Sequence, residues 1–292
     1  MHRFLRSVGF SEIRKTEDLD RIIRDVAANH NVKTVAGTPD GRQFVELSLD
    51  YAYDCGITLC GEYDDSGRFR MEYYYPHYRG SLISSNDEVI IDRQADKRAF
   101  VGACEDRRVD ITLIFTLIQA AQFLNSRPDK DSMRVKNPAL ALSCLAETGT
   151  VLLSVKKNVL QMQEATKKMQ KRNALITRAR NGDEDAIESL TIDDMDTFNR
   201  INRRIMSEDL YSIVDTCFMP YGFECDQYSI VGEIRQVRTT TNSYTGEMLY
   251  QMAVVCNDIS LDVCINAADL FGEPKRGRRF KGVVWLMGSL YY

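Results

Sequence analysis

The sequence predicts an α+β fold with three parts: an N-terminal antiparallel-sheet domain with a helix, a central charged helical hairpin, and a C-terminal small β-barrel. Three observations predict it. Strand-like runs separated by turn signals continue to about residue 155, a helix-forming stretch without Gly or Pro follows, and alternating apolar runs return from residue 228. We therefore expect domains over residues 1–155, 156–207 and 208–292, and a chain of 292 residues is long enough for them.

The composition is that of a globular protein. It is 44% hydrophobic and has 42 acidic against 38 basic groups, a net charge of −4, which gives no reason to expect general affinity for nucleic acid or membranes. The longest apolar run, Ile111–Leu124, has 14 residues, fewer than the roughly 20 of a spanning helix, and its helix or strand state is ambiguous. Eight scattered cysteines without a CxxC pair indicate reduced thiols, so we expect a cytoplasmic protein.

The N-terminal part is predicted from one helix and a series of strands. Apolar residues at helical spacing in residues 17–29 predict an amphipathic helix. Short apolar or alternating runs then predict strands at residues 44–49, 56–63, 69–75, 89–92, 99–103, 140–145 and 151–155. Together they favour an antiparallel sheet with one amphipathic helix.

The central part is predicted to be helical and charged. Residues 156–180 are rich in Lys, Gln, Met, Ala and Leu, and Gly182 marks the end of this helix. Residues 133–180 hold ten basic and two acidic groups, whereas residues 181–226 hold three basic and twelve acidic groups. Antiparallel segments of opposite charge would attract each other. An apolar seam would also allow the protein to self-associate, and it consists of Val155, Val159, Met162 and Met169.

The C-terminal part reads as four strands with clean alternation, at about residues 228–237, 248–256, 259–266 and 280–290. Asn257 and Asp258 form a two-residue turn between the second and third strands. Gly232 and Gly282 inside strands suggest the bends that a small closed barrel needs. The pattern is similar to that of an OB-fold.

The densest basic feature is the sequence KRGRRFK near the C-terminus. Its five cationic side chains predict an anion-binding loop, because Arg supplies paired donors and Gly277 lets an anion approach the backbone. The candidate residues are Lys275, Arg276, Arg278, Arg279 and Lys281. On a small barrel such a loop would contact nucleic acid or another anionic partner. The alternative is a solvated turn, or a loop that docks on the acidic segment 181–226.

A second candidate is a polar pocket in the sequence EYYYPHYRG. Strand alternation places Tyr73 and Tyr75 on one face, with His77 and Arg79 beyond Pro76. His77 titrates near neutrality and would serve as a general acid or base in an enzyme. The alternative reading is that Tyr is common in strands and that a His after Pro in a loop lies at the surface.

Metal and cofactor motifs are missing from the sequence. It contains only three His, none at ligand spacing, and none of the common nucleotide-binding or hydrolase patterns. We therefore expect no metal and no cofactor, and a binding or adaptor protein is favoured over an enzyme.

Three stretches of the sequence are distinctive: the opening MHRFLRSVGFSEI, FMPYGFECDQYSIVGEI and GEPKRGRRFKGVVWLMG. Through them the chain resembles an uncharacterised clostridial family of bacterial (Firmicutes) proteins of about the same length. The family is one of unknown function, so the resemblance brings no activity, ligand or residue role. The leading hypothesis remains a non-enzymatic binding protein, with self-assembly and an enzyme at residues 72–80 as the alternatives.

Overall fold

The computed structural model describes most of the chain outside its centre. The described residues are 2–38, 42–93, 99–106, 108–109, 111–126, 133–154, 171–172, 174–175, 177–179, 182–192, 195 and 215–291. The chain divides into two compact units, one formed by Met1–Leu152 with Thr216–Tyr292, the other by Leu153–Asp215. The first unit is therefore built from two separate pieces of the chain.

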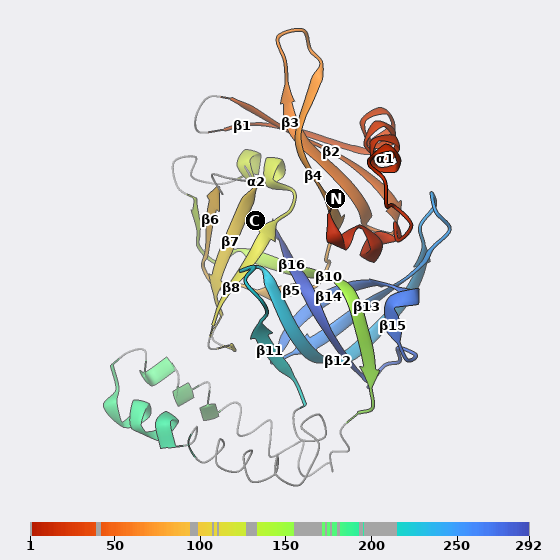
Figure 1. Ribbon diagram of the computed structural model, residues 1–292. Helices are drawn as coiled ribbons and strands as arrows, with labels where there is room; N and C mark the ends of the chain where they lie inside the picture. The colour runs from red at the N-terminus through yellow and green to blue at the C-terminus, as the bar shows by residue number, and fades with distance from the viewer. Residues whose placement is uncertain are drawn as a thin grey trace. The chain divides into compact units, whose positions relative to one another are not determined.

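A four-stranded antiparallel sheet, called sheet A here, lies near the N-terminus in the order β1-β2-β3-β4 (Figure 1). Its strands are β1 (Val32–Gly37), β2 (Gln43–Ala52), β3 (Cys55–Tyr63) and β4 (Phe69–Tyr78). The 3-10 helix η1 (Arg3–Val8) precedes helix α1 (Thr16–Asn29), which packs against β2 and β3. The buried residues Leu19, Ile22 and Val26 recur at helical spacing on α1, as the sequence predicts.

A second, twelve-stranded sheet, called sheet B, contains the remaining strands of this unit. Those that precede the central segment are β5 (Ile83–Ser85), β6 (Val89–Arg93), β7 (Phe100–Glu105), β8 (Thr112–Leu117), β9 (Arg134–Val135) and β10 (Ala139–Leu152). Those that follow it are β11 (Cys217–Pro220), β12 (Gln227–Thr241), β13 (Met248–Cys256), β14 (Ile259–Asn266), β15 (Leu270–Phe271) and β16 (Arg279–Tyr291). The short 3-10 helix η2 (Ala267–Asp269) joins β14 to β15.

Strand β10 joins the two pieces of the chain. It pairs in parallel with β14, with Ser143 opposite Asp262, and antiparallel with β16. Since β12 pairs with both β13 and β16, and β13 pairs with β14, five strands close a ring in the order β12-β13-β14-β10-β16. The ring therefore needs a strand from residues 139–152 as well as the C-terminal strands.

The predicted fold class is wrong. The chain is mostly β, and the C-terminal strands share one large mixed sheet with strands from the first half of the chain instead of forming a separate small β-barrel. The physical reason is the parallel pairing of β10 with β14, a contact between residues over a hundred positions apart that periodicity does not encode. Alternation locates strands but not their neighbours.

The predicted central helical hairpin is also not evident in the structure. In the described part of the second unit, residues 171–172, 174–175, 177–179, 184–192 and 195 are helical. Asp183 accepts a hydrogen bond from the backbone N–H of Ala186 at 3.1 Å and forms an ion pair with Arg178. The predicted seam of Val155, Val159, Met162 and Met169 lies outside the described residues, so self-association through it stays a prediction.

The ambiguous run Ile111–Leu124 is both strand and helix. It forms β8 and then helix α2 (Ala120–Ser126), and Gln119 between them adopts a left-handed backbone with φ 58°. Such a φ is uncommon outside Gly and ends the strand sharply. Within the ranges that the structure describes, no helix combines the length and apolar character that crossing a membrane requires.

Candidate functional site

One face of sheet A carries polar side chains that are buried. Along β2, Glu46, Ser48 and Asp50 alternate with apolar residues, so the three polar side chains share one face. Glu46 is 5% exposed and Ser48 is 9% exposed. Buried polar groups must find partners, because an unpaired one costs about 1–3 kcal/mol. This face, which we call the polar face, is therefore a place where specific contacts have to form.

Asp50 and His77 meet above a glycine. The strand register places Gly56 of β3 between Asp50 of β2 and His77 of β4 in one row across the sheet. With no side chain at the middle position, His77 Nε2 reaches Asp50 Oδ1 at 2.8 Å. A Cβ atom at Gly56 would lie 1.9 Å from the carbonyl oxygen of Leu49, so the strands approach too closely there for any other residue.

The other nitrogen of His77 continues into a row of hydroxyl groups. Nδ1 lies 2.9 Å from Thr58 Oγ1, which lies 2.8 Å from Ser48 Oγ. Because a carboxylate only accepts, the Nε2 facing Asp50 carries the proton, and Nδ1 then accepts from the Thr58 hydroxyl. The resulting order of carboxylate, imidazole and hydroxyl is the order in which a general base is oriented in hydrolytic triads.

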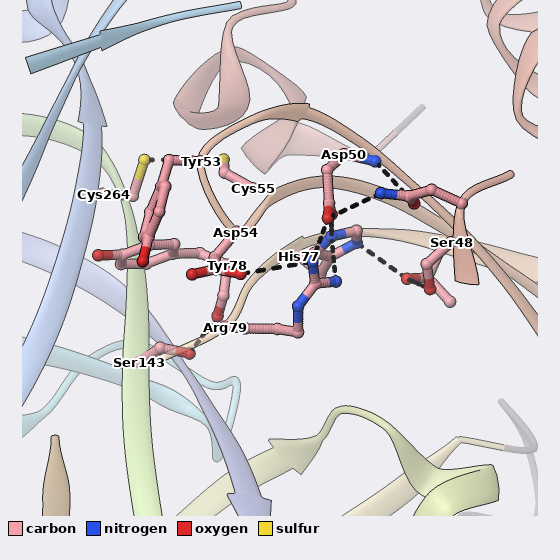
Figure 2. A network of polar contacts seen from close by, with 12 residues as sticks. Ser48, Asp50, Tyr53, Asp54, Cys55, His77, Tyr78, Arg79, Ser143 and Cys264 are labelled. Carbon is pink, nitrogen blue, oxygen red and sulfur yellow. Dashed lines mark hydrogen bonds and ion pairs between the residues drawn. The ribbon is translucent and has the colours of Figure 1, made fainter. Parts of the chain in front are cut away.

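Arg79 completes the network from the end of β4 (Figure 2). Its guanidinium forms an ion pair with Asp50 Oδ2, and Asp54 lies 3.7 Å away on the same side. Nη1 is 2.9 Å from His77 Nε2, but neither group has a free acceptor there, so the two donors share Asp50, one oxygen each. Arg79 thereby balances the charge of a carboxylate that holds a neutral imidazole.

These contacts shift the titration of both partners. Burial by itself raises the pKa of Asp50, but the hydrogen bond to His77 and the charge of Arg79 outweigh it and hold that pKa well below its usual range. Burial lowers the pKa of His77, and the neighbouring Asp50 only partly opposes this effect. At neutral pH the network therefore consists of an ionised Asp50, a neutral His77 and a charged Arg79.

A cavity of about 90 Å³ opens beside this network. We call it the His77 cavity. Strands β1 to β4 supply most of its wall, including Ser48, Thr58 and His77, while Gln119 just before α2 and Gln122 within α2 also line it. Its groups are hydroxyls, amides, an imidazole and a carboxylate, all able to make directed hydrogen bonds.

Glu46 fixes helix α2 over the cavity. Its carboxylate accepts hydrogen bonds from the backbone N–H groups of Ala120 at 3.2 Å and Ala121 at 2.9 Å, and from the Tyr75 hydroxyl at 3.1 Å. Burial raises the pKa of Glu46, and these three donors oppose the rise. The residue thus joins the helix start to the polar face.

The four residues of the predicted pocket lie at the end of β4. Tyr75, His77 and Arg79 line the His77 cavity, whereas Tyr73 does not and instead stacks on Tyr75 with ring centroids 6.3 Å apart. Pro76 does not end the strand, so His77 continues its alternation and is 2% exposed. The alternative reading, in which a His after Pro lies in a loop at the surface, is therefore wrong for His77.

The five residues of the basic loop have different surroundings. Lys275 forms an ion pair with Glu273 at 2.7 Å, and Arg278 donates to the Glu273 carbonyl oxygen at 2.8 Å. Arg279 belongs to β16 and is 6% exposed, and burial lowers its pKa. Arg276 is exposed and Lys281 lies further along β16. Anion binding at these five residues stays a prediction, as does docking on segment 181–226, part of which lies outside the described residues.

Several residues of the network are missing from the sequence-based candidates: Glu46, Ser48, Asp50 and Thr58. The signal that could have found three of them is the sequence VELSLD, where polar and apolar residues alternate inside an otherwise hydrophobic strand. Elsewhere in the described ranges, no three His, Cys, Asp or Glu side chains come together as metal ligands would.

Comparisons with known proteins give a family and no activity. No curated protein and no solved structure matches the chain. A family model described as "Domain of unknown function, E. rectale Gene description (DUF3881)" matches residues 5–288, which is nearly the whole sequence. The chain therefore belongs to this family of unknown function, as its resemblance to an uncharacterised clostridial family predicts.

Proposed function

We propose that this protein binds a small, uncharged, hydroxyl-rich molecule in the His77 cavity. The observation that carries the proposal is the buried row of Asp50, His77, Thr58 and Ser48, whose hydroxyl end faces a cavity. Ligand sites are typically concave and present a few convergent polar groups held in place by their neighbours. Here each wall group is oriented by the next one in the row.

Charge in the wall argues against an anionic ligand. Among the residues lining the cavity, Arg79 carries the permanent positive charge, and Asp50 neutralises it. Glu46 adds a carboxylate, and burial already makes its ionisation unfavourable. A second negative charge in the same space would raise that cost further. Hydroxyl groups fit better, because they both donate and accept and so match the mixed wall.

Size limits the ligand further. About 10–15 Å³ of cavity volume holds one water molecule, which has one non-hydrogen atom. A cavity of about 90 Å³ therefore takes roughly six to nine non-hydrogen atoms. That is the size of a short polyol such as glycerol or erythritol.

The alternative of an enzyme that uses His77 as a general acid or base stays a prediction.

The test is ligand-detected NMR of the full chain with glycerol and erythritol at millimolar concentration. We expect saturation transfer to one or both polyols with the natural protein and a loss of about tenfold in affinity with Ser48→Val, which removes a hydroxyl and fills the cavity. Ser229→Val is the matched control, since Ser229 is a half-buried strand serine of β12 that lines neither cavity discussed here.

Two outcomes would contradict the proposal. The first is that neither polyol binds to the natural protein. The second is that both Val variants bind as the natural protein does, which would place the contact elsewhere. Thermal unfolding of each variant checks that a loss of binding does not come from a loss of folding.

A further inference from the structure

A second cavity, of about 100 Å³, lies where the strand ends of sheet A meet strands β12 to β14 of sheet B. We call it the Gln251 cavity. The turn at Tyr53 and Asp54 and the chain after β4 form one wall, and side chains of β12, β13 and β14 form the other. It is distinct from the His77 cavity, and Arg79 is the residue that borders both.

The floor of the Gln251 cavity consists of two adjacent rows across sheet B. In one row Arg238 of β12 lies opposite Gln251 of β13. In the next row on the same face, Ala253 of β13 lies opposite Asp262 of β14. Ala253 has only a methyl side chain, and the charged residues Arg238 and Asp262 belong to the two outer strands of this floor, β12 and β14.

Gln251, which lines this cavity, has a side-chain acceptor without a partner. Its Nε2 donates to the Tyr53 carbonyl oxygen at 2.6 Å, which fixes the orientation of the amide because a carbonyl oxygen only accepts. The Oε1 atom is buried without a hydrogen-bond partner, and the residue is only 4% exposed. A buried acceptor without a donor is costly, so a donor from a molecule bound beside Gln251 would be stabilising.

Asp262 presents a carboxylate to the same space. It is 7% exposed, and its Oδ2 accepts from the backbone N–H groups of Ser81 at 2.7 Å and Leu82 at 3.0 Å. Both hydrogen bonds go to Oδ2, which leaves Oδ1 for a ligand. Burial raises the pKa of Asp262, and a cation placed beside it would favour the ionised form again.

Arg238 supplies the opposite charge. Its guanidinium lies over the Tyr53 ring, 3.9 Å from the ring centroid, which holds the side chain at the cavity edge. Among the described residues it forms no ion pair within 4.0 Å, and in particular none with Asp262. The planar donor groups of a guanidinium match a carboxylate in a paired geometry.

We infer that the Gln251 cavity binds a small zwitterion of the α-amino-acid class. Its ammonium group donates to Gln251 Oε1 and Asp262, and its carboxylate pairs with Arg238. One molecule with both charges satisfies the orphaned acceptor, the carboxylate and the guanidinium at once. By the same measure as above, about 100 Å³ takes at most roughly ten non-hydrogen atoms, so the side chain must be short, as in alanine or serine.

The test is isothermal titration of the full chain with L-alanine and L-serine, and with ethylamine and propionate, which each keep one of the two charges. We expect at least one of the amino acids to bind about tenfold or more tightly than either single-charge analogue. Gln251→Met and Arg238→Gln should each weaken this binding by about tenfold or more. Arg235→Gln, an exposed position on the same strand paired with Glu233, is the matched control and should leave it unchanged.

The inference is overturned if neither amino acid binds, if ethylamine or propionate binds as tightly, or if the Gln251 and Arg238 variants bind like the control. Ser48→Val separates this site from the His77 cavity, because it should leave amino-acid binding intact. The thermal midpoint of each unliganded variant shows whether it is folded. For a variant that fails to fold, Gln251→Glu keeps the side-chain length and should still bind the ammonium group.

Discussion

The contact between His77 and Asp50 depends on one residue that carries no functional group. Gly56 of β3 lies between them and has no side chain. The His77 imidazole of β4 and the Asp50 carboxylate of β2 can therefore make contact across β3. The alternation in VELSLD indicates that Asp50 shares a face with Ser48, and this could be read from the sequence. Which residue faces Asp50 across β3 could not, because that depends on strand register.

The same contact predicts a pH dependence of stability. Burial lowers the pKa of His77 below its ordinary value of 6.5, so the unfolded chain binds a proton in a pH range where the folded chain does not. Stability from a neutral buried His is complete above pH 6.5 and is lost as the pH falls below it. We expect the free-energy difference between the natural protein and His77→Gln to shrink by up to about 2 kcal/mol from about pH 7.5 to about pH 5.

Urea unfolding at several pH values measures this difference. Glu46 titrates in both proteins and cancels, and Asp50, whose pKa lies well below its usual range, stays ionised throughout this window. A free-energy difference that is constant with pH would show that His77 binds protons equally in the folded and unfolded states, and one that grows as the pH falls would show that folding favours its protonated form.

At the scale of elements, helix α2 is held in place by a side chain of sheet A. It has seven residues, too few to be stable alone, and its first N–H groups donate to Glu46 of β2. Glu46→Gln would turn one of the accepting oxygens into an NH₂ group that faces a backbone N–H. We therefore expect the amides of Ala121–Ser126 to exchange with deuterium about tenfold faster or more, equivalent to roughly 1–3 kcal/mol.

Hydrogen exchange read by mass spectrometry of peptides covering α2 checks this. Glu62→Gln is the control, because Glu62 lies on neighbouring β3 and is only half-buried. Equal protection of α2 in both variants would mean that packing of its apolar face, and not Glu46, holds the helix.

Strand positions were largely predictable, and their partners were not. The predicted strand at residues 140–145 falls within β10, and the four C-terminal strands match β12, β13, β14 and β16 in place. Yet β10 is buried between β14 and β16, and nothing in its local pattern distinguishes these neighbours from the strands beside it in sequence. Long-range pairing is a property of the whole chain.

At the scale of the molecule, the first unit needs both pieces of the chain. A fragment of residues 1–152 would expose most of both hydrogen-bonding edges of β10, since only the short strand β5 would still pair with it, and a fragment of residues 216–292 would lack one strand of the ring. We expect neither fragment to unfold cooperatively on its own and the mixture of both to regain the transition of the natural protein. Thermal unfolding followed by circular dichroism measures it, and an independent transition of residues 1–152 would contradict it.

The division into residues 1–155, 156–207 and 208–292 stays a prediction that these fragments also test. The sequence could suggest His77, Tyr75 and Arg79 as site residues because their side chains are chemically distinctive. It could not suggest Gln251 or Asp262, which look like ordinary polar residues of exposed strand faces until β13 and β14 are seen beneath the turn at Tyr53.

Arg79 stands in the wall of both cavities and is bound to Asp50 in one of them. A ligand in either cavity that moves the Arg79 guanidinium would change the hydrogen-bond donors that line the other cavity. Energetic communication of this kind is reciprocal: if the first guest alters the affinity for the second by some factor, the second alters the affinity for the first by the same factor. If both cavities bind ligands as proposed, Arg79 is therefore the residue through which binding at one cavity would affect binding at the other.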